Sequence, residues 1–185
     1  MTSLPDRPTL LIDAARSLFM EKGFSAVGMR EIAARAGLTP TQAYRLGLAK
    51  EDLLAEISIC LTDEQLQSIT VKMKPRSAES LPRFVERYLL KLYTSDIQHI
   101  RIRRESAAYG WMWSEKYETR IIEQVMALLQ PIASALSARG LENIPARGLA
   151  IWSLYYVGYR QAVVGGSSAK ECLDFIRDSL ALALK

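Results

Sequence analysis

The stretch GLTPTQAYRLGLAKEDLL, from Gly37 to Leu54, decides how the chain begins to fold. Gly37 is typical of a helix end. Thr39 followed by Pro40 is typical of a helix start, because threonine caps the first turn and proline lacks only a donor that is unpaired there. Gln42 stands three residues after Thr39, the spacing of a capping box. Two short helices separated by so tight a turn predict a steep crossing, as in a helix-turn-helix.

The residues around this turn have the side chains that a DNA-reading helix needs. In a helix-turn-helix, the second helix presents its N-terminal turn to base edges while neighbouring groups hold phosphates. Glutamine can bond adenine at two positions and arginine can bond guanine at two. Two short helices joined by glycine also occur in bundles that never bind DNA, so the local pattern leaves both interpretations open. The residues assigned to DNA binding are Arg30, Thr39, Pro40, Thr41, Gln42, Tyr44, Arg45 and Lys50.

Apolar residues recur with a helical period along almost the whole chain, and no strand-like alternation persists. A first stripe runs from Leu11 to Phe19, and Gly23 follows it as a stop signal. The segment KMKPRSAES, around Pro75, is the clearest break. The sequence predicts an all-α protein of about nine helices, the later ones at about 96–113, 115–139, 146–165 and 168–184.

Composition excludes several classes of protein. The chain has 185 residues, of which 49% are hydrophobic, and a net charge of +4, too mild a surplus to identify a nucleic-acid binder. It has no secretory pattern and no uncharged run of the roughly 20 residues that a spanning helix needs, so we expect a cytoplasmic protein without a membrane partner. Cys60 and Cys172 match no metal or redox spacing, and His99 is the single histidine. We therefore expect neither an enzyme nor a cofactor.

The segment LIDAARSLFMEKGFSAVGMREIAARAGLTPTQAYRLGLAKEDLL, residues 11–54, resembles the DNA-binding region of the tetracycline-repressor (TetR) family. The shared features are the A-x-x-L-F helix, the E-K-G-F turn, R-E-I-A-x-R-A-G-L-T, the Tyr-Arg pair and Lys-Glu-Asp-Leu-Leu. The resemblance implies a DNA-binding domain at residues 1–49 and a larger helical ligand-binding and dimerisation domain at 50–185. It further implies a homodimeric regulator, expected to be a repressor, that binds a pseudo-palindromic site on double-stranded DNA and responds to a small-molecule effector.

The chain departs from the family pattern at the end of the recognition helix. The family follows Tyr-Arg with His or Tyr and then Phe, whose ring packs inside the small domain, whereas this chain has Leu46 and Gly47. Leu46 or Leu48 is expected to fill that space. Gly28 stands where a capping threonine is common, so that helix start loses a side-chain acceptor. These departures leave an alternative: a helical dimeric module for ligand or protein whose degenerate helix-turn-helix binds DNA weakly or not at all.

Aromatic residues in the second half of the chain are candidates for an effector pocket, which the resemblance implies. Tyr109, Trp113 and Tyr117 recur every four residues, which predicts that they share one helix face. Plain core packing is the other interpretation. The basic cluster from His99 to Arg104 is expected either to hold an acidic ligand group or to form a solvated face or a contact with the DNA-binding domain. The residues assigned to ligand binding are Tyr88, Leu92, Tyr109, Trp113, Tyr117, Trp152 and Tyr156.

Small residues form a seam on the helix expected at 146–165, and small side chains let helices approach closely. In the TetR family the last two helices of each subunit make a four-helix dimer interface, so the resemblance places the interface here. The helix expected from Lys50 to Lys72 links the two domains and is the expected lever between ligand and DNA. The residues assigned to the interface are Ile151, Leu154, Tyr155, Gly158, Ala162, Phe175, Ile176 and Leu180.

Overall fold

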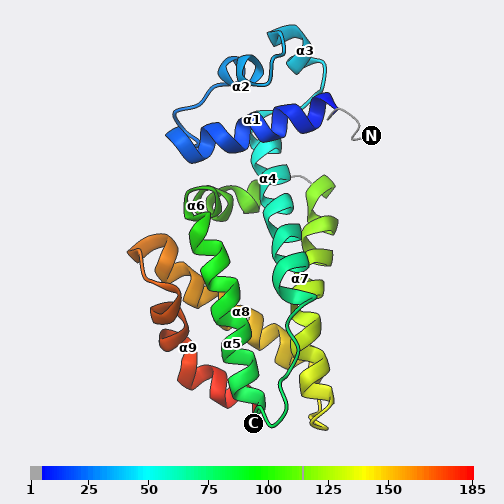
Figure 1. Ribbon diagram of the computed structural model, residues 1–185, viewed down its shortest axis with the longest axis vertical. Coiled ribbons are helices and arrows are strands. Elements are labelled where there is room, and N and C mark those ends of the chain that lie inside the picture. Colours follow the sequence, from blue (N-terminus) through cyan, green and yellow to red (C-terminus); the bar gives the residue numbers. More distant parts are fainter. Residues whose placement is uncertain (1–5, 114) are drawn as a thin grey trace. The chain divides into compact units, whose positions relative to one another are not determined.

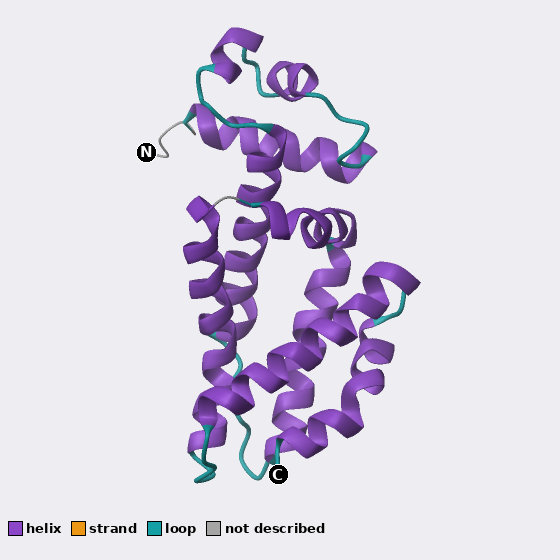
Figure 2. Ribbon diagram, turned by 180° about the vertical axis from the view of Figure 1, so that it is seen from behind, coloured by secondary structure: helices purple, strands orange, loops and turns teal. Residues whose placement is uncertain are grey.

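The computed structural model describes residues 6–113 and 115–185, and in these ranges the chain is all-α, with nine α-helices and no strand. Figure 2 shows only helices and the loops that join them. A π-helical segment, Leu66–Thr70, follows the fourth helix, and a 3-10 turn, Gly110–Met112, follows the sixth. The all-α prediction is confirmed. The helices are α1 (Arg7–Lys22), α2 (Met29–Arg35), α3 (Pro40–Tyr44), α4 (Lys50–Gln65), α5 (Leu81–Gln98), α6 (Ile100–Tyr109), α7 (Glu115–Ser137), α8 (Ile144–Gly165) and α9 (Ala169–Ala183).

Capping residues fix the ends of several helices. Asp6 accepts a 3.0 Å hydrogen bond from the backbone N–H of Thr9 and so caps α1, while Gly23, with φ of 85°, ends it in a conformation that favours glycine. Ser168 and Glu171 form a capping box at the start of α9. These local signals fix the start of α9 and both ends of α1.

The helix predicted at 96–113 is wrong as a single element. The chain instead ends α5 at Gln98, turns at His99, runs through α6 and then tightens into the 3-10 turn at Gly110. Trp113 lies beyond that turn in extended backbone. Tyr109, Trp113 and Tyr117 therefore do not share one helix face, because the four-residue spacing holds only within an unbroken helix.

Backbone contacts divide the chain into two compact units. The first contains the chain up to Leu61 together with Arg101–Arg120, and the second contains Thr62–Ile100 and Ile121–Lys185. Helix α4 begins in the first unit and ends in the second. These units are defined by contacts, and the functional division predicted after residue 49 stays a prediction.

The core of the first unit lies between α1, α2, α3 and the first turns of α4. Figure 1 shows α1, α2 and α3 grouped together, and α2 contacts both of the others. Ile102 of α6 is buried in the same core. The fully or almost fully buried residues from the N-terminal helices include Leu11, Ala15, Leu18, Phe19, Ile32, Ala33, Leu53, Leu54 and Ile57.

The second unit is built around the packing of α5, α8 and α9 (Figure 1). Helix α8 contacts both α5 and α9, and Gly158 lies where they meet. A Cβ atom at Gly158 would lie 2.9 Å from the carbonyl oxygen of Cys172 and would collide with the hydroxyl oxygen of Tyr93. None of the helices, over the residues described, has a window long and apolar enough to cross a bilayer.

Candidate functional site

The recognition helix α3 is held by a complete capping box. The N–H of Gln42 donates to Oγ1 of Thr39 at 3.2 Å, and the N–H of Thr39 donates to Oε1 of Gln42 at 2.9 Å. Pro40 occupies the first turn. Helix α3 ends at Tyr44, and Gly47 follows with φ of 68°, which favours glycine. The predicted capping box is confirmed.

Replacing Gln42 by alanine is expected to lower the free energy of unfolding by about 1 kcal/mol, because the N–H of Thr39 loses its acceptor. Gln42→Glu is the matched control, since a carboxylate accepts the same bond. Urea denaturation of both variants measures the difference. Equal losses in the two variants would contradict a capping role for this side chain.

Helix α3 exposes the side chains assigned to base contact. Tyr44 is 86% exposed, and Thr41 and Arg45 are also exposed. Gln42 is only partly exposed because its side chain turns back toward Thr39. Arg30, on α2, is exposed as well. The surface of α3 thus offers one guanidinium, one hydroxyl and one phenol to a ligand.

Two ion pairs join α1 to α2, and α2 in turn contacts α3. Arg35 donates to both carboxylate oxygens of Glu21, each at 3.0 Å, and Nζ of Lys22 lies 2.5 Å from Oε1 of Glu31. The hydrogen bond from Arg35 lowers the pKa of Glu21. Exposed pairs of this kind typically add less than about 1 kcal/mol each, so the buried core supplies most of the stability.

Lys50, assigned to phosphate contact, also has a structural role. Its ammonium donates to the carbonyl oxygens of Phe24 and Val27, both at 3.1 Å, and lies 4.2 Å from the centroid of the Phe24 ring. An ammonium has three donors, so one is left for a phosphate oxygen. The bonds tie the start of α4 to the loop between α1 and α2.

Leu46 and Leu48 both pack, partly buried, against the core of the first unit. Tyr109 and Trp113 also pack there, and the ring of Tyr109 lies 5.0 Å from that of Phe24. The two leucines thus pack at the border of this core, and α6 and the turn after it add aromatic rings to it. Tyr117, also in the first unit, donates a 3.0 Å hydrogen bond to Oδ1 of Asp52.

The basic cluster after α5 binds backbone carbonyls of the first unit. Arg101 donates to the carbonyl oxygens of Met20 and Glu21, which are unpaired acceptors at the end of α1, and Arg103 donates to that of Ser58. The bonds of Arg101 match the interpretation of a contact with the predicted DNA-binding domain, whereas the acceptor of Arg103 lies on α4, outside residues 1–49.

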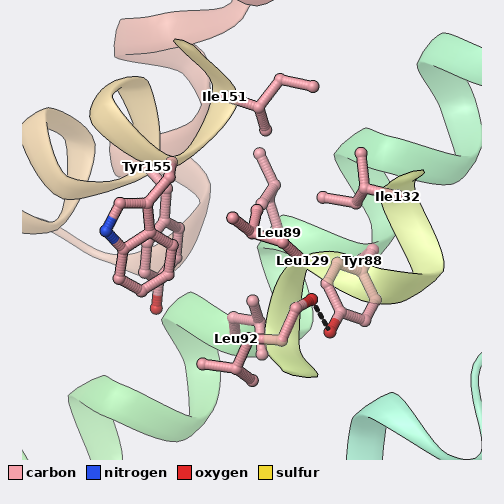
Figure 3. A pocket seen from close by; sticks show the side chains of 9 residues that line it. Tyr88, Leu89, Leu92, Leu129, Ile132, Ile151 and Tyr155 are labelled. Carbon is pink, nitrogen blue, oxygen red and sulfur yellow. Dashed lines mark hydrogen bonds between the residues drawn. The ribbon is translucent and has the colours of Figure 1, made fainter. Parts of the chain in front are cut away.

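A narrow apolar pocket lies in the second unit, between α5, α7 and α8 (Figure 3). Its own side chains fill it, so that as they stand it leaves no space for a water molecule. Three residues of the predicted ligand set, Tyr88, Leu92 and Trp152, line it. Tyr109, Trp113 and Tyr117 belong to the first unit, and Tyr156 is 44% exposed on α8. The lining residues are Tyr88, Leu89, Leu92, Leu128, Leu129, Ile132, Ile151, Trp152 and Tyr155.

Hydrogen bonds hold the tyrosines of the pocket wall. The hydroxyl of Tyr88 donates to the carbonyl oxygen of Leu128 at 2.7 Å and lies 2.8 Å from Oγ1 of Thr70. The hydroxyl of Tyr155 donates to the buried carboxylate of Asp96, which also accepts a 2.7 Å bond from Nε2 of Gln65. Burial raises the pKa of Tyr88 to about 12, so its phenol stays neutral. The pocket wall is thus linked through Asp96 to Gln65, the last residue of α4, and directly to Thr70, the last residue of the π-helical segment.

Comparison with known proteins agrees with the sequence resemblance at the N-terminus. Residues 11–57 match the family model of bacterial regulatory proteins of the tetR family. The resemblance to the TetR family is confirmed. No curated protein matches the chain.

Solved structures of TetR regulators share the fold over nearly the whole chain. A TetR transcriptional regulator from Rhodococcus sp. RHA1 is 20% identical, with a TM-score of 0.67 over 96% of this chain and 94% of that one. A regulator of the TetR/AcrR family from Thermobifida fusca is 23% identical, with a TM-score of 0.65 and 98% of both chains covered. FadR from Bacillus subtilis, solved in complex with stearoyl-CoA, is 15% identical, with a TM-score of 0.65 over 96% of this chain and 97% of that one. At these identities the likeness is one of fold.

Within this TetR-type fold, most residues assigned to the dimer interface are buried inside the protomer. They form the contact of α8 with α5 and α9, and side chains buried there are not available to a partner. Leu154 is partly exposed, and Phe175 is 60% exposed. The buried members are Ile151, Tyr155, Gly158, Ala162, Ile176 and Leu180.

A different set of apolar side chains covers the outer faces of α8 and α9. Sequence reasoning assigned only Phe175 of this set to the interface. The spacing of the others was a usable signal, because Leu149, Tyr156 and Val164 recur at helical intervals opposite the small-residue seam. The exposed apolar residues of the two helices are Leu149, Tyr156, Val157, Val164, Phe175 and Leu182.

Proposed function

We propose that this protein is a transcriptional regulator that binds DNA as a homodimer and releases it when a small-molecule effector binds, that is, a ligand-responsive repressor. The observation that carries the proposal is α3: a short helix with a complete capping box and exposed Thr41, Tyr44 and Arg45, within a segment that matches the tetR family model. A rigid short helix with polar side chains directed outward suits insertion into a major groove.

In the proposed complex with DNA, some side chains contact bases and others contact phosphates. Arg45 and Thr41 contact base edges, because guanidinium and hydroxyl groups fit the donor and acceptor pattern of the major groove. Tyr44, Arg30 and the remaining donor of Lys50 contact phosphates, which position the protein but carry little sequence information. Gln42 reaches a base only with its amide NH₂ group while its oxygen stays in the capping box.

The packing of Leu46 and Leu48 argues against the alternative of a degenerate helix-turn-helix. That alternative rested on a missing aromatic ring beside the recognition helix. Both leucines pack against the core of the first unit, which supports the expectation that an apolar side chain replaces the ring. Together with the capping box, this packing supports a recognition helix that keeps its orientation.

The exposed apolar residues of α8 and α9 support a homodimer. Several large apolar side chains exposed on two helices that contact each other suit a protein interface. In a twofold dimer the same surface meets itself, and four helices, two from each subunit, bury one another. The dimer places two copies of α3 on the two half-sites of a pseudo-palindrome.

The pocket of the second unit is the proposed effector site. FadR, a protein of the same fold, holds stearoyl-CoA, which supports ligand response as a property that this fold can carry. A ligand that moves Tyr155 or Tyr88 changes the bonds to Gln65 and Thr70, at the end of α4 and just beyond it. Helix α4 starts beside the recognition helix in sequence, so it is the proposed lever. The coupling required is typically about 1–3 kcal/mol.

Two substitutions separate base reading from phosphate contact. Arg45→Ala is expected to reduce affinity for the preferred duplex by roughly 5- to 150-fold and to relax the preference at particular base pairs, since a bidentate arginine discriminates by about 1–3 kcal/mol. Lys50→Ala is expected to weaken all duplexes alike and to reduce the slope of affinity against salt. Fluorescence anisotropy on a panel of single-base variants of the duplex measures both effects.

The assignment of Arg45 to bases and Lys50 to phosphates requires that the two variants differ in how their affinity varies across the duplex panel. Arg30→Ala serves as a second phosphate variant, because Lys50 also stabilises the loop between α1 and α2. If Arg45→Ala lowered the affinity for every duplex by the same factor, its role as a base reader would be wrong.

A further inference from the structure

The amide of Gln42 meets DNA in a fixed orientation, because its oxygen takes part in the capping box of α3. We infer that Gln42 is a specificity-determining residue that selects guanine through its amide nitrogen, rather than the adenine that a freely rotating glutamine favours. With Arg45, whose guanidinium also pairs best with guanine, the expected half-site contains two G·C pairs. This inference rests on the proposed function, because it names the base read by one side chain of the proposed DNA contact.

The capping box determines which atom of the Gln42 amide faces the backbone. The N–H of Thr39 donates to Oε1 of Gln42 at 2.9 Å, and the N–H of Gln42 donates to Oγ1 of Thr39 at 3.2 Å. Turning the amide over would bring Nε2, a donor, against the donating N–H of Thr39, and the bond would be lost. The oxygen is therefore the atom held at the start of α3, and Nε2 lies on the other side of the amide carbon.

The nitrogen of this amide is available to a base. Among the residues that the structure describes, Nε2 of Gln42 has no hydrogen-bond partner. It is not one of the buried side-chain atoms that lack a partner, so solvent reaches it. Residues three apart are neighbours on a helix surface, so Gln42 adjoins the exposed Arg45. Gln42 thus adds an N–H donor group beside the guanidinium assigned to base contact.

The major-groove edges of the bases differ in how well they fit this donor group. Guanine presents two acceptors, N7 and O6, so both hydrogens of Nε2 find a partner while the capping box stays closed. Thymine presents one acceptor, O4, and cytosine presents only the N4 amino group, which is a donor. We therefore expect guanine to be preferred, thymine to bind more weakly and cytosine to be the poorest partner.

Adenine is disfavoured because its best contact uses the oxygen that the capping box holds. It presents N7, an acceptor, beside the N6 amino group, a donor, and a glutamine pairs with both through its nitrogen and its oxygen. Turning the oxygen of Gln42 out to adenine would leave the N–H of Thr39 without an acceptor in the interface, which offsets one of the two bonds gained. If the capping box stays closed, the N6 amino group and the N–H of Thr39 share one oxygen, and the two donors repel each other.

Binding to duplexes that carry each of the four bases at every position of the half-site tests the inference. Selection of random duplexes by the wild type supplies the half-site, and anisotropy measures the affinities. The position read by Gln42 is the one at which Gln42→Ala removes the base preference. There the wild type is expected to prefer guanine over adenine by about three- to tenfold and over cytosine by about tenfold or more.

Gln42→Glu is the matched variant, because a carboxylate keeps the capping box with one oxygen and presents the other to the base as an acceptor. Its preference at the same position is expected to change to cytosine or adenine, whose amino groups donate, by about fivefold or more over guanine. The added charge repels phosphates and lowers the affinity for every duplex, so the ratio between bases is compared. The ratios at the position read by Arg45 are the internal control and are expected to stay unchanged.

Amide hydrogen exchange shows whether the capping box stays closed on DNA. The N–H of Thr39 is expected to exchange at least as slowly in the complex as in the free protein, because its acceptor stays in place. In Gln42→Ala this N–H is expected to exchange roughly fivefold faster, since the acceptor is missing.

The inference is overturned if adenine is preferred at the position read by Gln42, if Gln42→Ala leaves every base preference unchanged, or if Gln42→Glu still prefers guanine. Faster exchange of the Thr39 N–H in the complex than in the free protein overturns it as well. Each of these results leaves sequence-selective DNA binding, and with it the proposed function, intact. A wild type that binds no duplex selectively removes the proposed function and this inference together.

Discussion

Replacing Phe175 by glutamate is expected to convert the dimer into monomers and to weaken binding to a duplex with two half-sites by roughly 100-fold or more. Phe175 is 60% exposed on α9, so the protomer loses little packing when its ring is removed. Within the proposed dimer each subunit would bury one such carboxylate in the apolar interface. Two like charges without counter-ions oppose such an interface strongly.

Sedimentation velocity and anisotropy measure the two parts of this prediction on the same protein. Val157→Glu, on α8, is expected to act in the same way. Met126→Glu is the matched control, because it adds the same charge to an exposed apolar position on α7. A Phe175→Glu protein that remains dimeric would place the interface elsewhere, and a monomeric wild type at micromolar concentration would remove the dimer itself.

Gly158→Ala is expected to destabilise the protein by about 2–4 kcal/mol, although alanine normally stabilises a helix relative to glycine. The added Cβ would lie 2.9 Å from the carbonyl oxygen of Cys172 and would collide with the hydroxyl oxygen of Tyr93. Tyr93 donates a 3.0 Å hydrogen bond to the carbonyl oxygen of Tyr155 and stacks on that residue, so a shift of its ring breaks both contacts. The cost of overpacking and of the lost bond exceeds the gain in helix propensity.

Gly148→Ala, on the same helix, is expected to change the free energy of unfolding in the opposite direction. Nothing lies within 4 Å of a Cβ at that position, so the substitution is expected to stabilise the protein by about 0.5–1 kcal/mol. Thermal and urea denaturation of both variants give the comparison. Equal effects in the two would show that helix propensity, and not the close approach of α8 to Tyr93 and Cys172, decides stability at Gly158.

The N-terminal helices could be predicted from the sequence because their signals are local. The capping box of Thr39 and Gln42 and the stop at Gly23 each depend on residues within a single turn. The missing side-chain cap at Gly28 follows from the residue type alone. The packing of Leu46 against the core of the first unit was predictable because leucine, like the aromatic residue common in the TetR family, has an apolar side chain that favours burial.

The aromatic set could not be grouped correctly, because its grouping depends on where a helix ends. Tyr109, Trp113 and Tyr117 have helical spacing, but the 3-10 turn at Gly110 interrupts the helix between them. Gly110 was a usable signal for that break. The π-helical segment after α4 has no such signal in the sequence.

The small-residue seam of α8 shows why an interface is harder to predict than a helix. Gly158 and Ala162 indicate that another helix approaches closely, but the pattern is the same whether that helix belongs to the same chain or to a partner. In this protein the close neighbours are α5 and α9 of the same chain. The outward face of α8, with Leu149 and Val164, has helical spacing that the sequence already shows, but the spacing alone does not say which face of the helix packs inside the protomer.

Selection of random duplex DNA on the purified protein, followed by a salt titration of the enriched sequence, tests the central claim most directly. A DNA-binding dimer predicts enrichment of a near-palindromic sequence whose half-sites lie about one or more helical turns apart, with affinity that falls steeply as salt rises. A folded dimer that enriches no sequence, even at low salt, would contradict a regulatory role for α3.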